Sequence, residues 1–110
     1  MADVQREFTN YKVYYFSGGS TAARPAAAEI DCFDATSTRV GSIFFYSYDA
    51  PLPLAENTMS GIYLHFPVSR FADVMTLLKE EKPLYINFDS TNTWGYLATA
   101  IEPVGEQEGT

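Results

Sequence analysis

The chain has 110 residues, the usual size of a single domain with its own hydrophobic core. Its 14 acidic residues outnumber the 7 basic ones, and the net charge of −7 argues against a protein held to nucleic acid by bulk electrostatics. One cysteine and one histidine exclude an internal disulfide, a cysteine-based zinc site and a histidine-rich metal site, so we expect no metal and no cofactor.

Four strands are expected in the first two thirds of the chain. Runs rich in aromatic and β-branched residues place them at 8–16, 29–34, 39–48 and 61–66. Between them, the small and flexible residues of 17–28 and the proline-containing segment 49–60 predict two long loops. The short link between the second and third strands predicts an antiparallel hairpin.

The next segment has the period of an amphipathic helix. Its apolar stripe consists of Phe71, Val74, Met75, Leu77 and Leu78. Ser69 is suited to the N-cap and Pro83 predicts the end of the helix. Two more strands are expected at 84–89 and 94–101. The predicted core combines the apolar side of the helix with the neighbouring strands, in Ile62, Leu64, Phe66, Phe71, Val74, Leu78, Leu84, Ile86 and Phe88.

The expected fold is α+β: a curved antiparallel sheet of about six strands with one main helix, in the order β-β-β-β-α-β-β. It forms one domain over 1–110, with flexible tails at 1–7 and 103–110. If the first four strands form a meander, the two long loops lie at the same end of the sheet. Loops of this length are uncommon in a compact domain unless they are functional or disordered, so this end is a candidate binding rim.

The chain has an aromatic surplus, with 8 Tyr, 8 Phe and 1 Trp. Alternation along the predicted strands places rings on both sheet faces, and the second face is rich in tyrosine instead of charge. Tyrosine suits a surface that is sometimes wet and sometimes covered. Three arrangements would cover this face: the sheet curls so that the face becomes core, a second copy packs on it, or it binds a flat ligand or nucleic acid.

Catalysis has few candidate residues, and we expect none to be catalytic. His65 is the only imidazole and is expected on the tyrosine-rich face; an enzyme would need a hydroxyl or carboxylate beside it. Cys32 alternates with Ile30 and is expected to be a buried small residue. Glu29 and Asp31 share one side of a strand and could form a paired-carboxylate site. Exposed acidic residues on a strand edge are more common than such a site, and we expect that arrangement here.

Single-stranded nucleic acid is an alternative ligand. Proteins that bind it stack bases on aromatic rings and line the backbone with cations. The residues suited to nucleic-acid or partner binding are Tyr11, Lys12, Tyr15, Arg39, Tyr46 and Trp94. The small number of basic residues disfavours this alternative.

The segment GIYLHFPVSRFADVMTLLKEEKPLYINFD, followed later by IEPVGE, resembles small bacterial proteins with the fold of single-stranded DNA-binding transcriptional regulators. Whirly proteins and Pur-alpha-like repeats share this fold. The similarity covers about residues 8–106 as a pattern of elements and includes no catalytic motif. It implies a curved antiparallel sheet with a packed helix, dimers of such units, and nucleic-acid binding. The chain departs from it in having few basic residues to present.

We therefore expect a non-enzymatic binding or interaction module that self-associates as a homodimer through an aromatic-rich sheet face, or binds a protein partner. A single-stranded nucleic-acid-binding regulator is the first alternative, and a small enzyme using His65 is the second. The chain starts without a leader-like apolar stretch and has no apolar run of membrane-spanning length, so we expect a cytoplasmic protein without membrane contact.

Overall fold

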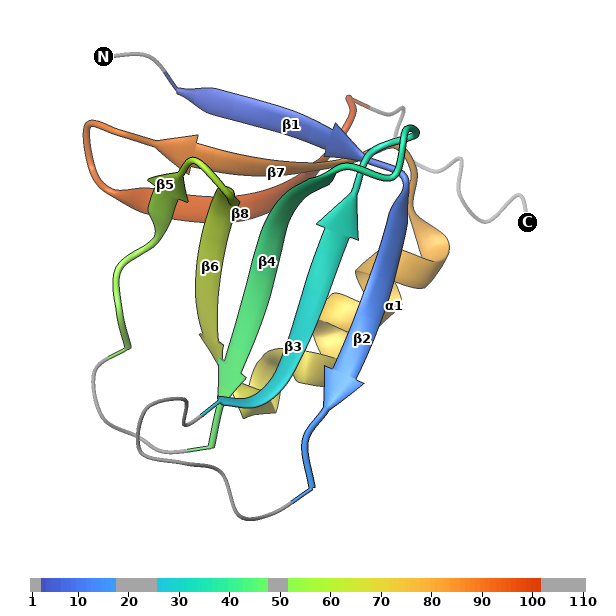
Figure 1. Cartoon of the computed structure of the whole chain (residues 1–110), viewed down its shortest axis with the longest axis vertical. Helices are drawn as coiled ribbons and strands as arrows, with labels where there is room; N and C mark the ends of the chain where they lie inside the picture. Colours follow the sequence, from blue (N-terminus) through green and yellow to red (C-terminus); the bar gives the residue numbers. More distant parts are fainter. Residues whose placement is uncertain (1–2, 18–25, 48–51, 102–110) are drawn as a thin grey trace.

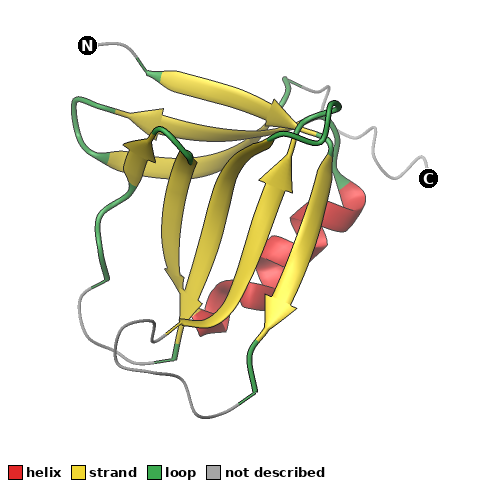
Figure 2. Ribbon diagram, in the orientation of Figure 1, coloured by secondary structure: helices red, strands yellow, loops and turns green. Residues whose placement is uncertain are grey.

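The computed structural model describes residues 3–17, 26–47 and 52–101, which form an α+β fold (Figure 1). The helix α1 (Phe71–Glu80) lies behind a five-stranded sheet, and a three-stranded sheet lies across one end of that sheet (Figure 1 and Figure 2). The predicted α+β class with one main helix is confirmed. The single sheet of about six strands is wrong, because the described residues form eight strands in two sheets.

The five-stranded sheet has the order β2-β3-β4-β6-β5. Its strands are β2 (Asn10–Tyr15), β3 (Ala26–Phe33), β4 (Arg39–Tyr46), β5 (Glu56–Thr58) and β6 (Gly61–Pro67). Neighbours are antiparallel except β4 and β6, which are parallel. We call the side that packs on α1 the helix face and the opposite side the far face.

The three-stranded sheet is antiparallel and has the order β1-β7-β8. Its strands are β1 (Val4–Phe8), β7 (Leu84–Asp89) and β8 (Trp94–Thr99). The two sheets approach closely at Gly95 of β8. A Cβ added there would lie 2.7 Å from Ala55 Cβ and would overlap the Leu64 side chain of β6.

The strand predicted at 8–16 is two strands in different sheets. β1 ends with Phe8 opposite Leu84 of β7, and β2 begins with Asn10 opposite Phe33 of β3. The chain passes between the sheets at Thr9, whose N–H donates to Phe33 O at 2.9 Å. Residues 4–7, expected in a tail, therefore belong to a strand, while the predicted tail 103–110 lies outside the described residues.

The expected meander is wrong. Part of the segment predicted as a loop forms β5, which pairs antiparallel with β6. This hairpin brings β6 alongside β4 in the parallel direction, with Ile43 opposite Leu64. The chain still leaves β2 and β4 at the same end of the sheet, because Ala28 pairs with Tyr15 and Ala26 with Tyr46. Residues 18–25 and 48–51, which include much of the candidate rim, lie outside the described residues.

The helix has the predicted apolar stripe. Val74 and Leu78 are buried, and Phe71, Met75 and Leu77 pack against the same cluster. The start of the helix differs from the prediction. A 3-10 turn, η1 (Val68–Arg70), precedes α1, so Arg70 is the N-cap and no side chain caps the helix. Ser69 as N-cap is therefore wrong, because it lies inside the turn.

The predicted core is confirmed. Its buried members are Ile62, Leu64, Val74, Leu78, Leu84 and Ile86, and its partly buried members are Phe66, Phe71 and Phe88. A second, smaller cluster lies on the far face, where Ala26, Phe44 and Tyr46 are buried with Leu52 and Tyr63 packed against them. This cluster accounts for part of the aromatic surplus.

Candidate functional site

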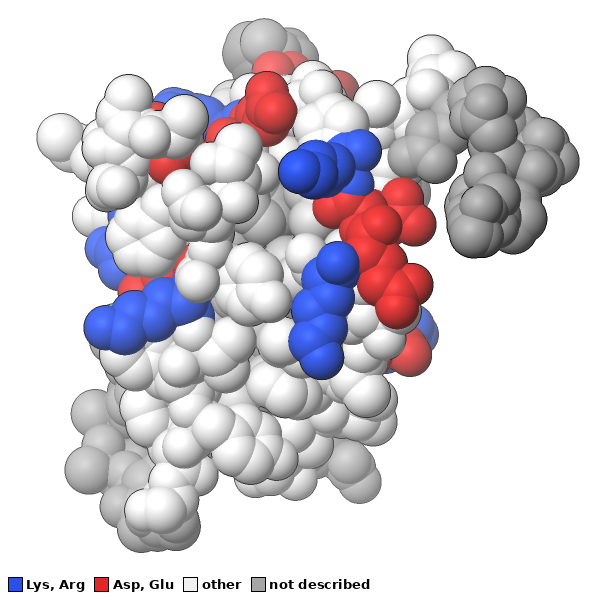
Figure 3. Space-filling model, turned by 90° about the vertical axis from the view of Figure 1, so that its right-hand side faces the viewer, with Lys and Arg blue, Asp and Glu red and all other residues white. Residues whose placement is uncertain are grey.

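Exposed aromatic side chains gather on β2, the outermost strand of its sheet. They are Tyr11, Tyr14 and Tyr15, with Phe16 directly after the strand, and we call this surface the aromatic edge. Tyr15 is 70% exposed, and its ring contacts Phe71 of α1 at a centroid distance of 5.3 Å. Figure 3 shows the side of the molecule with β2 and α1, where the lower part of the described surface carries no charged side chain. Uncharged, aromatic surface on an edge strand is typical of an interaction site.

The two faces of β2 differ. Tyr11 and Tyr15 lie on the helix face, because they pair with Cys32 and Ala28 of β3. Lys12 and Tyr14 lie on the far face, and Lys12 Nζ lies 5.1 Å from the centroid of the Tyr14 ring. Three of the predicted binding residues, at 11, 12 and 15, therefore share one strand but not one face.

The other predicted binding residues lie elsewhere. Tyr46 is 8% exposed and belongs to the cluster on the far face. Arg39 is on the far face too, with its Nη1 atom 3.8 Å from Asp31 Oδ2. Trp94 is 63% exposed but lies on β8 in the three-stranded sheet. The structure thus does not gather all six residues on one surface.

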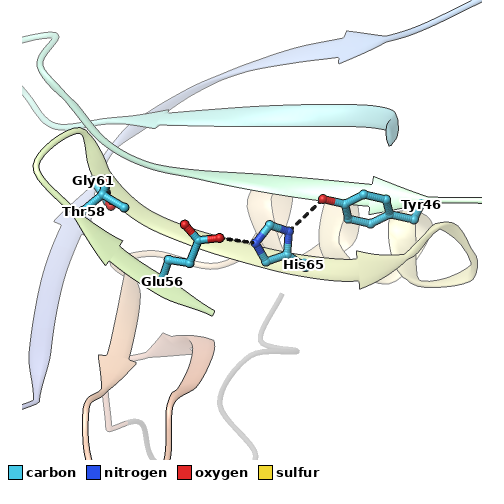
Figure 4. Close-up of polar contacts among 5 residues, drawn as sticks. All are labelled: Tyr46, Glu56, Thr58, Gly61 and His65. Carbon is cyan, nitrogen blue, oxygen red and sulfur yellow. Dashed lines mark hydrogen bonds and ion pairs between the residues drawn. The ribbon is translucent and has the colours of Figure 1, made fainter. Parts of the chain in front are cut away.

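A polar cluster surrounds His65 on the far face (Figure 4). Tyr46 Oη lies 2.9 Å from His65 Nδ1, and Glu56 Oε2 lies 3.5 Å from Nε2. The imidazole stacks on Phe44 at a centroid distance of 5.5 Å, and its side chain is only 6% exposed. The strands β4, β5 and β6 each supply one polar group. His65 on a tyrosine-rich face is therefore confirmed, whereas Glu56 was missed because its strand was predicted as a loop.

The surroundings of His65 favour a neutral ring. Burial lowers the pKa of His65, and the Glu56 carboxylate partly offsets this by favouring the protonated form. The tautomer with the proton on Nε2 would aim it at Glu56 and leave Nδ1 to accept from the Tyr46 hydroxyl. At 3.5 Å the Glu56 contact is long, and buried Nε2 has no hydrogen-bond partner among the described groups. Tyr46, His65 and Glu56 thus form a row of a hydroxyl, an imidazole and a carboxylate, an arrangement that can support acid–base chemistry. Here the same contacts also link three strands.

Of the other groups considered for chemistry, Asp31 and Cys32 are buried and Glu29 is half-buried. Asp31 is not on an exposed edge, which corrects that expectation, because β3 lies between β2 and β4. Its carboxylate accepts a hydrogen bond from Ser42 Oγ at 2.9 Å. Cys32 is fully buried, as predicted, and burial raises the pKa of its thiol to about 12. Neither arrangement leaves a reactive group open to a substrate.

A cleft of about 350 Å³ lies between the end of α1 and the corner where β1 passes to β2. Buried Phe8, Leu78 and Leu84 are among its apolar lining residues. Its charged lining residues are Glu7, Lys79, Glu80, Glu81 and Lys82. The volume is within the range of small-molecule sites. Because both signs of charge border the cleft, the lining by itself selects no class of charged ligand.

Comparisons with known proteins do not indicate a function for this chain. No protein-family model, no curated protein and no solved structure matches the chain. Within the described residues, no three histidine, cysteine, aspartate or glutamate side chains are grouped so that they could hold a metal ion. None of the helices in that part of the chain has the length and apolar character needed to cross a membrane.

Proposed function

We propose that the protein is a non-enzymatic interaction module that self-associates through the β2 edge of its five-stranded sheet. The observation that carries this proposal is the aromatic edge. Lys12 is the only charged residue of β2, and the rings on and directly after the strand are exposed. An edge strand offers unpaired N–H and C=O groups to another strand, and proteins usually protect such edges with charge, proline or bulges.

The other outer strands offer less to a partner. β1 carries Arg6 and Glu7, and β5 has only three residues. β8 has exposed aromatic residues, but Gly95, its second residue, lies against Ala55 and Leu64. Among the described strands, β2 therefore combines length, exposed aromatic surface and a free edge.

The alternatives have weaker geometric support. Stacking of single-stranded nucleic acid would need the tyrosines to share a surface with Lys12 and Arg39, but Tyr11 and Tyr15 lie on the opposite face from Lys12. An enzyme acting through His65 has the required hydroxyl and carboxylate neighbours. Its hydroxyl, however, belongs to the buried Tyr46.

The test is the oligomeric state of the whole chain, measured by sedimentation velocity over a wide range of concentrations. We expect the wild-type chain to form a dimer and Val13→Pro to stay monomeric, because proline removes an N–H that a partner strand would need. Phe16, three residues after Val13, donates its N–H to Ala27 O of β3, so by alternation the Val13 N–H points away from β3. Proline is tolerated where a strand N–H faces away from its neighbour, so Val13→Pro should still fold. Tyr15→Glu, at a highly exposed position, should also weaken the dimer, because it replaces an aromatic ring of the contact surface with a carboxylate that would have to lose water on association.

Val13→Ala is the matched control, since it shortens the same side chain but keeps the N–H. This variant should still form dimers, and circular dichroism should show that all three variants are folded. A wild-type chain that remains monomeric at every concentration overturns the proposal. So does a dimer that Val13→Pro and Tyr15→Glu leave unchanged.

A further inference from the structure

The backbone of β2 has one set of groups directed away from the sheet. Phe16 N–H donates to Ala27 O of β3 at 3.0 Å. Successive residues of a strand direct their N–H and C=O groups to opposite sides. Tyr11, Val13 and Tyr15 therefore direct these groups to the edge on which no described strand pairs with β2.

A second copy of β2 can use these groups if the two strands run antiparallel. A two-fold axis perpendicular to the sheet reverses the strand direction and keeps each face on its own side. Residues opposite each other in an antiparallel pair point to the same face. An axis between two residues would place neighbours in the sequence opposite each other, and their side chains point to opposite faces. The axis must therefore pass through a residue, which then lies opposite itself in the second copy. The candidates near the middle of the strand are Lys12, Val13 and Tyr14.

Charge and length select among these three registers. An axis at Lys12 places the two Lys12 side chains directly opposite each other, which is unfavourable. An axis at Tyr14 moves Tyr11 opposite Ser17, beyond the end of the strand. An axis at Val13 pairs Lys12 with Tyr14 of the second copy, a cation–aromatic contact of the kind already present within one chain at 5.1 Å.

We propose that two copies pair antiparallel through β2 with the two-fold axis at Val13. This inference rests on the proposed self-association and specifies its partner and register. Val13 then exchanges two N–H···O bonds with its own copy, and Tyr11 does so with Tyr15 of the second copy. On the helix face, the existing contact between Tyr15 and Phe71 is extended by Tyr11 of the second copy. The two five-stranded sheets become continuous, with both α1 helices on the same face.

Site-specific cross-linking tests the register with Lys12 kept in place. Single-cysteine replacements are made at the three outward positions: Tyr11→Cys, Val13→Cys and Tyr15→Cys. Pairs of variants are mixed, treated with a short thiol-specific cross-linker and analysed by mass spectrometry. Cys32 should not compete, because it is fully buried and its pKa is raised to about 12.

The axis at Val13 predicts two products: Val13→Cys linked to itself, and Tyr11→Cys linked to Tyr15→Cys. If Val13→Cys links instead to Tyr11→Cys, the axis is at Lys12; if it links to Tyr15→Cys, the axis is at Tyr14. Either result overturns the register but leaves self-association through β2 intact. A dimer with no cross-link at any of these positions overturns both proposals, since its contact lies elsewhere. A chain that sediments only as a monomer also overturns both.

Discussion

His65 makes stability depend on pH in a direction that its surroundings determine. Burial lowers its pKa below the usual 6.5, so the unfolded chain binds a proton at a higher pH than the folded chain does. Where the unfolded state binds more protons, the free energy of unfolding rises with pH. We therefore expect stability to be full above about pH 6.5 and to fall as the pH decreases below it. Urea denaturation at a series of pH values measures this slope.

Two variants test whether His65 causes this pH dependence of the free energy of unfolding. His65→Gln removes the chain's only imidazole and should flatten the pH dependence near pH 6.5. Glu56→Gln should lower the pKa of His65 further, because the carboxylate favours the protonated ring; NMR titration of the imidazole reads this directly. The lowered pKa values of Asp34 and Asp89 act in the more acidic carboxyl range and should not interfere. An unchanged slope in His65→Gln would contradict the assignment.

Helix α1 allows a test of which residue begins it. Because Ser69 lies in η1 and caps nothing, Ser69→Ala should change the free energy of unfolding by less than about 0.5 kcal/mol. Loss of a true N-cap costs about 0.5–2 kcal/mol. Leu78→Ala, on the buried side of the same helix, should cost about 2–5 kcal/mol and shows that the assay responds. A cost near 1 kcal/mol or more for Ser69→Ala would mean that its hydroxyl does cap the helix.

Individual elements could be predicted where apolar residues recur with the period of a helix or a strand, because that period shows which side is buried. The helical stripe from Phe71 to Leu78 and the alternation in Leu84–Asp89 are two such cases. Pairing between elements leaves no such local record. No glycine or proline marks the change of sheet at Thr9, and β5 is a short polar segment, ENT, that gains its strand conformation from pairing with β6.

The candidate site was predictable to the same degree. Alternation placed His65 on a face rich in tyrosine, because it depends only on the local strand. The contact between His65 and Tyr46 depends on the parallel register of β4 and β6, which a meander would not produce. The free edge of β2 likewise depends on the order of strands in the sheet, although the rings that cover it were evident from composition.

At the scale of the whole molecule, the two sheets share one hydrophobic core and approach each other closely at two glycines. One is Gly41 of β4, where an added Cβ would lie 2.7 Å from Ile86 Cδ1 of β7, and the other is Gly95 of β8. β8 passes over the five-stranded sheet at Gly95, where no side chain separates its backbone from Leu64 and Ala55. The contact lies on the edge of the sheet opposite β2, close to the hairpin of β5 and β6. A substitution at Gly95 therefore acts at a distance from the aromatic edge.

Gly95→Ala tests this contact. The new methyl group would overlap Leu64 and lie 2.7 Å from Ala55 Cβ, so β8 or its neighbours must shift, and we expect a loss of about 1–3 kcal/mol in the free energy of unfolding by urea denaturation. Tyr96→Phe, an exposed position on the same strand, should change stability little. The self-association measured by sedimentation should be unchanged in Gly95→Ala, because β2 lies at the far edge of the sheet. If the variant is as stable as wild type, the two sheets do not meet tightly at Gly95.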